Sequence, residues 1–504
     1  MSRIDPRPPV AAGADGHDGA GQSPAPLYAT RQKVYPRAVH GPVRRAKWAV
    51  LVACLALYYL VPWLRWNRGP GMPDQAVLAD IRQARLFLGP IEILPQEVYF
   101  ITGLLILGAV GLFAVTSLYG RVWCGFTCPQ TVWTDLFMWV ERRIEGDRNA
   151  RMKLDAQPLS AGKALRKVAK HAAWLLIALL TGGAWIMYFI DAPTVVREFF
   201  SGRASAETYL FVGLFTFTTY LLAGWAREQV CTYMCPWPRF QAAMLDENSL
   251  VVSYRAWRGE PQGKPSQPGV GDCVNCHACV HVCPTGIDIR DGQQLECIGC
   301  ALCADACDDV MHRLGRPGGL IAFETLGNLA AATAATAALP PGAARRDPGM
   351  AARRPMRAIR PRTLLYGAVM LVVAAAMGTA LLLRADQDLA VLRDRAPVYV
   401  RLSDGGIRNG YTLKLGNRGT GEAVLHLELD APPGFFFVVQ DAEPDTEGRP
   451  LLPLQRDGIG QWRVLVTAPA WVRAHDSTDI RFRVVDEAGR TAASAASVFL
   501  GPRP

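Results

Sequence analysis

The chain contains the stretch CVNCHACVHVCP at residues 273–284, followed by CIGCALCADAC at residues 297–307. In both runs the four cysteines are separated by two, two and three residues. A cubane iron–sulfur cluster needs four thiolates around one small body, and a loop with two-residue gaps presents three of them. The fourth thiolate comes from the other run. The spacing therefore predicts two cross-ligated 4Fe–4S clusters in a bacterial-type ferredoxin domain at residues 241–329.

The two clusters use different sets of cysteines. We assign Cys273, Cys276, Cys279 and Cys307 to cluster 1, and Cys297, Cys300, Cys303 and Cys283 to cluster 2. Structural zinc also binds Cys-x2-Cys pairs, and a disulfide framework is the other alternative. Two complete runs with the same spacing favour clusters, although Asp308 stands where the first run has Pro284.

Outside this domain, long apolar runs predict a membrane protein. Each run approaches the roughly 20 residues that a helix needs to cross a bilayer. The five runs lie at residues 48–64, 98–118, 172–190, 208–226 and 363–383. A sixth apolar run, at 122–140, contains Asp135 and a cysteine motif, and we interpret it as an interfacial or re-entrant helix.

The positive charge indicates how these spans are oriented. The chain has 54 basic and 44 acidic residues, a formal net charge of +10. A basic chain first suggests nucleic acid, but the excess lies beside the apolar runs, in residues 1–47, 119–170 and 345–362. This placement indicates a membrane protein that binds no nucleic acid, and the positive-inside rule predicts its orientation. We expect the N-terminus and the ferredoxin domain to be cytoplasmic, and the C-terminal domain to lie outside, in a periplasm-like space.

The remaining segments complete the predicted architecture. The C-terminal segment has short β-branched and aromatic runs between turn signals, which favours an all-β immunoglobulin-like sandwich. The predicted parts are a disordered arm (1–45), a four-helix membrane region (46–240), a basic linker (330–362), a fifth span (363–384) and the sandwich (385–504).

Two further cysteine motifs match each other. Both read Cys-x3-Cys-Pro, and each follows a span that runs toward the cytoplasm. Paired thiolates at this spacing suit a soft metal such as Cu(I) or a redox dithiol, and the alternative is that they are buried packing residues. The four cysteines are Cys124, Cys128, Cys231 and Cys235.

With these motifs established, the chain resembles the cytochrome c oxidase accessory protein family, named CcoG, FixG or RdxA. The resemblance rests on both Cys-x3-Cys-Pro motifs and on four further stretches. These are CPTGIDIRDG at 283–292, ECIGC at 296–300, DACDDVM at 305–311 and RAPVYVRLSDGGIRNG at 395–410.

The resemblance implies a bacterial inner-membrane iron–sulfur protein required for assembly of cbb3-type oxidases, with a periplasmic immunoglobulin-like domain at its C-terminus. Family members are thought to reduce Cu(II) to Cu(I), which makes this chain a candidate oxidoreductase. The expected partners are the lipid bilayer, oxidase assembly factors or copper chaperones, and an unidentified electron donor. The alternatives are a quinol-linked electron conduit to another partner and a non-redox assembly scaffold.

Overall fold

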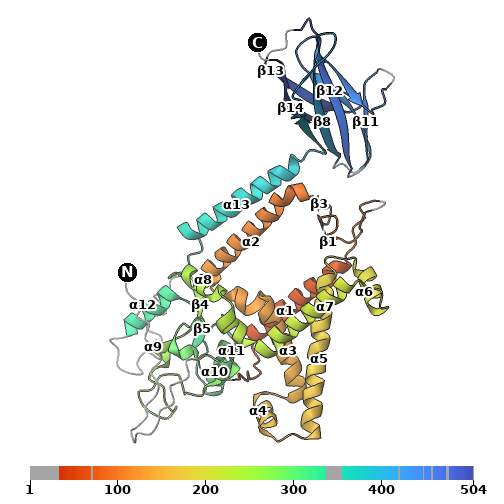
Figure 1. Ribbon diagram of the computed structural model, residues 1–504. Coiled ribbons are helices and arrows are strands. Elements are labelled where there is room, and N and C mark those ends of the chain that lie inside the picture. The colour runs from red at the N-terminus through yellow and green to blue at the C-terminus, as the bar shows by residue number, and fades with distance from the viewer. Residues whose placement is uncertain are drawn as a thin grey trace, which may run out of the picture. The chain divides into compact units, whose positions relative to one another are not determined.

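The computed structural model describes residues 33–69, 72–336, 355–417, 421–445, 448–455, 458–472 and 476–502 (Figure 1). The chain forms two compact units, Met1–Val373 and Ala374–Pro504, and the division falls within helix α13 (Pro361–Leu382). Residues 1–32 of the predicted arm (1–45) and residues 337–354 of the predicted linker (330–362) lie outside the described residues.

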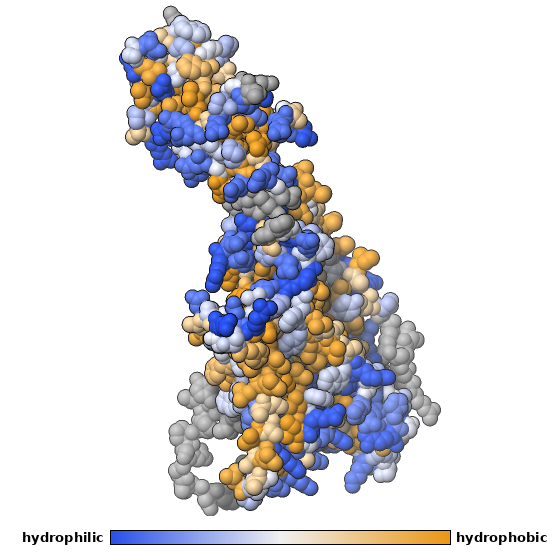
Figure 2. All heavy atoms as spheres, turned by 90° about the vertical axis from the view of Figure 1, so that its right-hand side faces the viewer, coloured by the Kyte–Doolittle hydropathy of each residue, from blue (hydrophilic) through white to orange (hydrophobic). Residues whose placement is uncertain are grey.

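Five helices of the described residues have the length and hydropathy to cross a membrane. Figure 2 shows their apolar side chains gathered over the helical part of the molecule. The helices are α1 (Pro42–Leu60, continued to Trp63), α2 (Val98–Tyr119), α5 (Ala161–Ile186), α7 (Ala206–Thr219, continued to Ala226) and α13.

Two of these helices start earlier than the apolar runs predict. Helix α5 begins at Ala161 rather than residue 172, because the Ser160 hydroxyl accepts a hydrogen bond from the Lys163 amide and caps a polar first turn. Helix α1 begins at Pro42 rather than Trp48, because its two buried cations, Arg44 and Lys47, have an acidic partner inside the protein.

Helices α5 and α7 approach each other closely. A Cβ atom on Gly182 of α5 would lie 2.8 Å from the Val212 carbonyl oxygen of α7. Small residues allow this approach between helices in a membrane, where packing rather than the hydrophobic effect drives association.

The sixth apolar run forms helix α3 (Pro129–Glu145), which is followed by α4 (Arg148–Ala156). One face of α3 is buried and carries Asp135, Glu141 and Glu145. Burial raises the pKa of Glu141, but the neighbouring Arg227 and Arg151 lower it to about 2. The Glu141 carboxylate is therefore ionised, and the carboxylates of α3 bind cations from several other elements.

Residues 33–41, which we call the N-terminal strap, make defined contacts with other segments, whereas the sequence predicts a disordered arm over residues 1–45. The Tyr35 hydroxyl donates to Asp155 at 2.7 Å, and the Arg37 amide donates to the His281 carbonyl at 2.7 Å. Arg151 donates to the Pro36 carbonyl at 2.7 Å. The strap therefore ties α4 to the cysteine-rich region, through partners far away in sequence.

The cysteine-rich region surrounds a two-stranded antiparallel sheet of β4 (Leu250–Tyr254) and β5 (Ile321–Thr325). Cys279 and Cys307 belong to a buried cluster with Met311. The helices of the cysteine-rich region are α9 (Ala256–Gly259), α10 (Ala278–Val282), α11 (Leu302–Arg313) and α12 (Leu326–Thr336).

Three smaller features were not predicted. A three-stranded antiparallel sheet precedes α2, and two short helices, α6 (Ala192–Phe200) and α8 (Trp237–Met244), connect longer elements. The strands of that sheet are β1 (Val77–Asp80), β2 (Arg85–Leu88) and β3 (Ile91–Ile93).

The second unit is a sandwich of two antiparallel sheets, in the orders β10-β12-β8-β6 and β11-β9-β13-β14, with β7 also pairing with β8. Strand β8 alternates buried and less buried residues over most of its length, and the Tyr411 hydroxyl donates across the sheets to the Val498 carbonyl at 3.1 Å. The strands are β6 (Gln387–Arg393), β7 (Val400–Arg401), β8 (Ile407–Asn417), β9 (Ala423–Asp430), β10 (Phe436–Gln440), β11 (Leu451–Leu454), β12 (Ile459–Ala468), β13 (Ser477–Val485) and β14 (Thr491–Leu500).

Candidate iron–sulfur and membrane-edge cysteine sites

The eight ferredoxin cysteines surround two cavities, each with an empty volume of about 350 Å³. Cys273, Cys276, Cys279 and Cys307 line the first cavity, and Cys283, Cys297, Cys300 and Cys303 line the second. In each of these sets three cysteines come from one run and the fourth from the other, and Cys279 of the first set also lines the second cavity. All eight are free thiols, and this donor set fits a 4Fe–4S cubane.

A single metal ion would require the side chains that line a cavity to converge on it. Among the described residues, no group of three or more His, Cys, Asp or Glu side chains converges on a single metal ion. A cubane needs thiolates spread around a body rather than gathered on one ion. The four cysteines assigned to each cavity are the donor set that a 4Fe–4S cubane uses, while Cys-x2-Cys pairs also allow zinc.

Backbone conformation explains how the tight loops form. His277 and Ala301 adopt φ of +54° immediately before α10 and α11, and Gly299 adopts φ of +67°. The left-handed residue turns each loop back, so that the cysteine on either side of it lies near the helix start. This is how three sulfurs separated by two residues reach one cavity.

The two cavities share a wall and differ in exposure. Cys279 lines both of them. Cys276, in the first cavity, is the one exposed cysteine among the eight. The first cavity therefore has an exposed cysteine on its wall, and the second cavity has none among the cysteines assigned to it.

The two Cys-x3-Cys-Pro motifs fold in the same way. Each forms a single π-helical turn, η3 (Trp123–Thr127) and η5 (Val230–Met234). The amide of the second cysteine donates to a carbonyl five residues earlier, at 2.9 Å for Cys128 and 2.8 Å for Cys235. The sequence predicts that the proline keeps the second cysteine out of the helical region, and ψ of 128° and 120° at these residues confirms it.

Both turns lie against the loop of cluster 2. A Cβ atom on Gly125 would lie 2.8 Å from the Cα atom of Cys300, so only glycine allows this contact. Arg121 donates to the carbonyls of Leu295 and Cys297, at 2.5 and 2.9 Å. Cys124 and Cys231 pack against the same buried cluster that contains Cys300.

The four membrane-edge thiols influence one another. Cys124, Cys128 and Cys231 are half-buried, and Cys235 is exposed. Burial and the nearby thiols of Cys128 and Cys231 together raise the pKa of Cys124 to about 12, against the opposing effect of Arg121. The Cys124 thiol also donates to Oε1 of Gln241 at 3.2 Å. The fold therefore brings the two motifs together.

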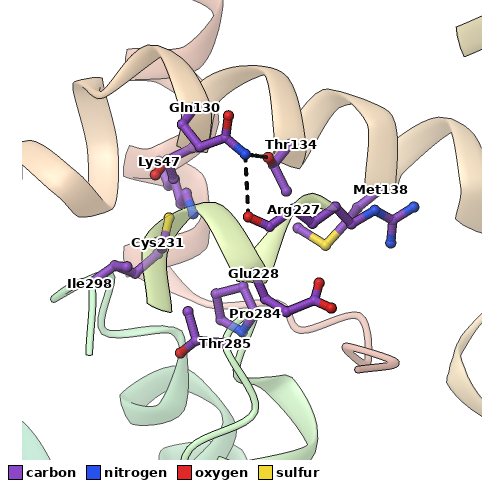
Figure 3. A pocket seen from close by; sticks show the side chains of 11 residues that line it. Lys47, Gln130, Thr134, Met138, Arg227, Glu228, Cys231, Pro284, Thr285 and Ile298 are labelled. Atoms are coloured by element: carbon purple, nitrogen blue, oxygen red, sulfur yellow. Dashed lines mark hydrogen bonds between the residues drawn. The ribbon is translucent and has the colours of Figure 1, made fainter. Parts of the chain in front are cut away.

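A cavity beside Cys231 is lined by residues that the sequence did not assign to either cysteine site (Figure 3). Lys47, Gln130, Arg227 and Glu228 line it together with Pro284 and Thr285 of the cluster 2 region. In the sequence, Lys47 counts only as part of the basic segment at residues 1–47, which indicates membrane orientation. The signal that could have located Lys47 in this site is Asp135, a single acidic residue in an apolar run, because a buried carboxylate requires a buried cation as partner.

Comparison with known proteins supports the same division of the chain. The family model described as a 4Fe–4S dicluster domain matches residues 226–326, and a second 4Fe–4S binding domain matches residues 101–146. A model described as the IG-like fold at the C-terminus of FixG matches residues 377–502. The 101–146 match contains only two cysteines, Cys124 and Cys128.

Full-length relatives are similar over most of the chain. Nitrogen fixation protein FixG of Rhizobium meliloti (strain 1021) is 49% identical, covering 88% of each chain. Protein RdxA of Cereibacter sphaeroides is 46% identical, covering 94% of this chain and 97% of its own. Among solved structures, a FixG-related protein from Vibrio parahaemolyticus is 18% identical, covers 23% of this chain and 95% of its own, and has a TM-score of 0.19.

Proposed function

This chain belongs to the FixG/RdxA family of iron–sulfur electron-transfer proteins, and from that premise we propose that it reduces Cu(II) to Cu(I) for assembly of a cbb3-type oxidase. The proposed electron path runs from cluster 1, through cluster 2, to copper bound by Cys124, Cys128, Cys231 and Cys235. The observation that carries this proposal is the contact between the Gly125 backbone and Cys300.

The proposed step transfers a single electron. A reduced cluster loses one electron and Cu(II) becomes Cu(I), with no bond to carbon, nitrogen or oxygen made or broken. Soft thiolate ligands favour the Cu(I) product. Because the buried thiols of Cys124 and Cys231 are protonated at neutral pH, copper binding to them releases protons.

We further propose that the clusters and the N-terminal residues are cytoplasmic, and that the immunoglobulin-like domain is periplasmic. The basic segments beside the membrane-length helices and the odd number of those helices support this orientation.

The test is an anaerobic titration of the purified, dithionite-reduced protein with Cu(II), following Cu(I) with a chelator and the clusters by absorbance. The wild-type protein should form one Cu(I) for each cluster electron lost. Cys124→Ser/Cys128→Ser and Cys231→Ser/Cys235→Ser should each slow Cu(I) formation by at least tenfold. Cys54→Ser removes a thiol of α1 that lies outside both motifs, and it should leave the rate unchanged.

Iron analysis of the same variants separates this proposal from its main alternative. If the pairs bind copper, iron content stays the same when they are replaced. Loss of iron instead means that the pairs hold an iron–sulfur cluster, which the 4Fe–4S match to residues 101–146 favours. An unchanged rate of Cu(I) formation in both double variants contradicts the copper assignment.

A further inference from the structure

Lys47 is buried where the membrane helices, Cys231 and the loops of cluster 2 meet. Only 2% of the residue is exposed. It lines one cavity with Cys231, with Pro284 and Thr285 next to Cys283, and with Ile298 between two other ligands (Figure 3). A buried lysine is unusual, because burying an ammonium group costs free energy unless the charge is paired with a group of opposite charge.

The carboxylate beside Lys47 is already engaged by another cation. Asp135 lies 3.5 Å from the Lys47 Nζ atom, and it accepts two hydrogen bonds from Arg44 Nη1 at 2.9 and 2.7 Å. Two buried cations therefore share one carboxylate. The charge of Lys47 is only partly neutralised by Asp135.

Residues of both cysteine sites line the cavity that Lys47 lines. Pro284 follows Cys283 and Ile298 follows Cys297, and both of these cysteines are assigned to cluster 2. Cys231 belongs to the second Cys-x3-Cys-Pro motif. The ammonium group of Lys47 is therefore placed between the loops of cluster 2 and the membrane-edge cysteines.

A cluster gains one negative charge when it is reduced. A buried cation nearby stabilises the reduced form and so raises the reduction potential, and net charge near a cluster is one of the main determinants of its potential. Low local dielectric strengthens the effect.

We propose that Lys47 sets the reduction potential of cluster 2, and that its buried ammonium group draws electrons from cluster 1 toward the membrane-edge cysteines. The step is an exchange of one electron: cluster 1 is oxidised, cluster 2 is reduced, and no proton moves. The inference rests on the cluster assignment proposed above, and its test needs no copper. Its failure is therefore distinguishable from failure of the copper proposal.

The experiment is an EPR-monitored redox titration of the anaerobic holoprotein and of Lys47→Met. The variant should lower the equilibrium constant for reduction of cluster 2 about tenfold, a shift of about 59 mV for one electron, and leave cluster 1 unchanged. Cys303→Ser alters a ligand of cluster 2 only. The reduction potential that changes in this variant therefore identifies the titration step of cluster 2.

Three variants serve as comparisons. Lys47→Arg keeps the charge and should leave both potentials in place. Arg45→Gln removes the same charge from an exposed position in the first turn of α1, and it should also change neither potential. Asp135→Asn removes the shared carboxylate and should move cluster 2 in the opposite direction, to a more positive potential.

Iron content and absorbance establish that each variant holds its clusters. If Lys47→Met retains both clusters and neither potential moves, the proposal is wrong. It is also wrong if both clusters shift equally. If Lys47→Met loses its clusters, Asp135→Asn decides the question, because a shift to a more negative potential or no shift contradicts the proposal.

Discussion

Single residues set the contact between the two types of cysteine site. Gly125 is the clearest case, because its missing side chain lets the first π-helical turn touch the backbone of Cys300. Arg121 then fixes the turn through two carbonyls of the same loop. The distance available for electron transfer therefore depends on a glycine and an arginine that bind no metal.

Gly125→Ala should separate the membrane-edge cysteines from cluster 2. The added Cβ would lie 2.8 Å from the Cα and 2.9 Å from the amide nitrogen of Cys300, so backbone must move. We expect Cu(I) formation by the reduced protein to slow at least threefold, with cluster absorbance and iron content unchanged.

Gly108→Ala is the matched control, because a Cβ at Gly108 of α2 meets no atom within 4 Å. Equal rates in the two variants would show that the contact at Gly125 plays no part in electron transfer.

At the scale of the element, the start of α1 is capped by a residue far away in sequence. The Asp305 carboxylate of α11 accepts hydrogen bonds from the amides of Val43 and Arg44, at 3.3 and 2.7 Å. A Cβ on Gly41 would collide with that carboxylate. A carboxylate at a helix N-terminus satisfies free amides and complements the helix dipole. The cap therefore joins the first span to the ferredoxin region.

Asp305→Ala should destabilise this junction by about 1–2 kcal/mol, the usual cost of losing a helix cap. We expect a lower thermal unfolding temperature, followed by cluster absorbance, and faster proteolysis within residues 33–41. Asp309→Ala, on the exposed side of the same helix, removes only an ion pair with Arg313 and should change neither quantity. Equal stability of both variants would count against the cap.

The sequence predicted elements well where a pattern is local. The five apolar runs correspond to membrane-length helices, and the C-terminal segment with β-branched and aromatic runs forms strands. Two strands of that segment lack this local signal, because β14 is rich in Ala and Ser and β11 contains Pro453. Their strand conformation comes from pairing with neighbours, which tertiary context decides.

The candidate site also has features that local sequence predicts and features that it does not. Cysteine spacing predicted two sets of four cysteines, and each set lines one cavity, although Cys279 of the first set also lines the second. The spacing did not predict that Lys47 and Gly125 would lie against the cysteine-rich region, or that Asp305 would cap α1. Those contacts join segments more than 170 residues apart, and a single sequence carries no signal for them.

At the scale of the whole molecule, the chain forms two compact units, each with its own hydrophobic core. The sandwich core includes Leu413, Val464 and Phe482, none of which is exposed. The described cysteines all lie in the other unit. Stability of the sandwich and chemistry of the clusters should therefore vary independently.

Leu413→Ala should test this independence. Truncating a fully buried leucine costs about 2–5 kcal/mol, so the sandwich should unfold at a lower temperature or denaturant concentration. Cluster absorbance and reduction potentials should stay the same. Leu392→Ala, at a residue that is 53% exposed, should change stability by less than about 0.5 kcal/mol. Loss of clusters in Leu413→Ala would contradict the division.

The N-terminal strap has a consequence for biosynthesis. Its partners include His281, and the cap of α1 is Asp305, both more than 240 residues further along the chain. A ribosome therefore delivers the first span to the membrane long before these partners exist. The start of that span acquires its final contacts only after the cysteine-rich segment has folded, so maturation of the metal-binding region and completion of the membrane anchor are one late event.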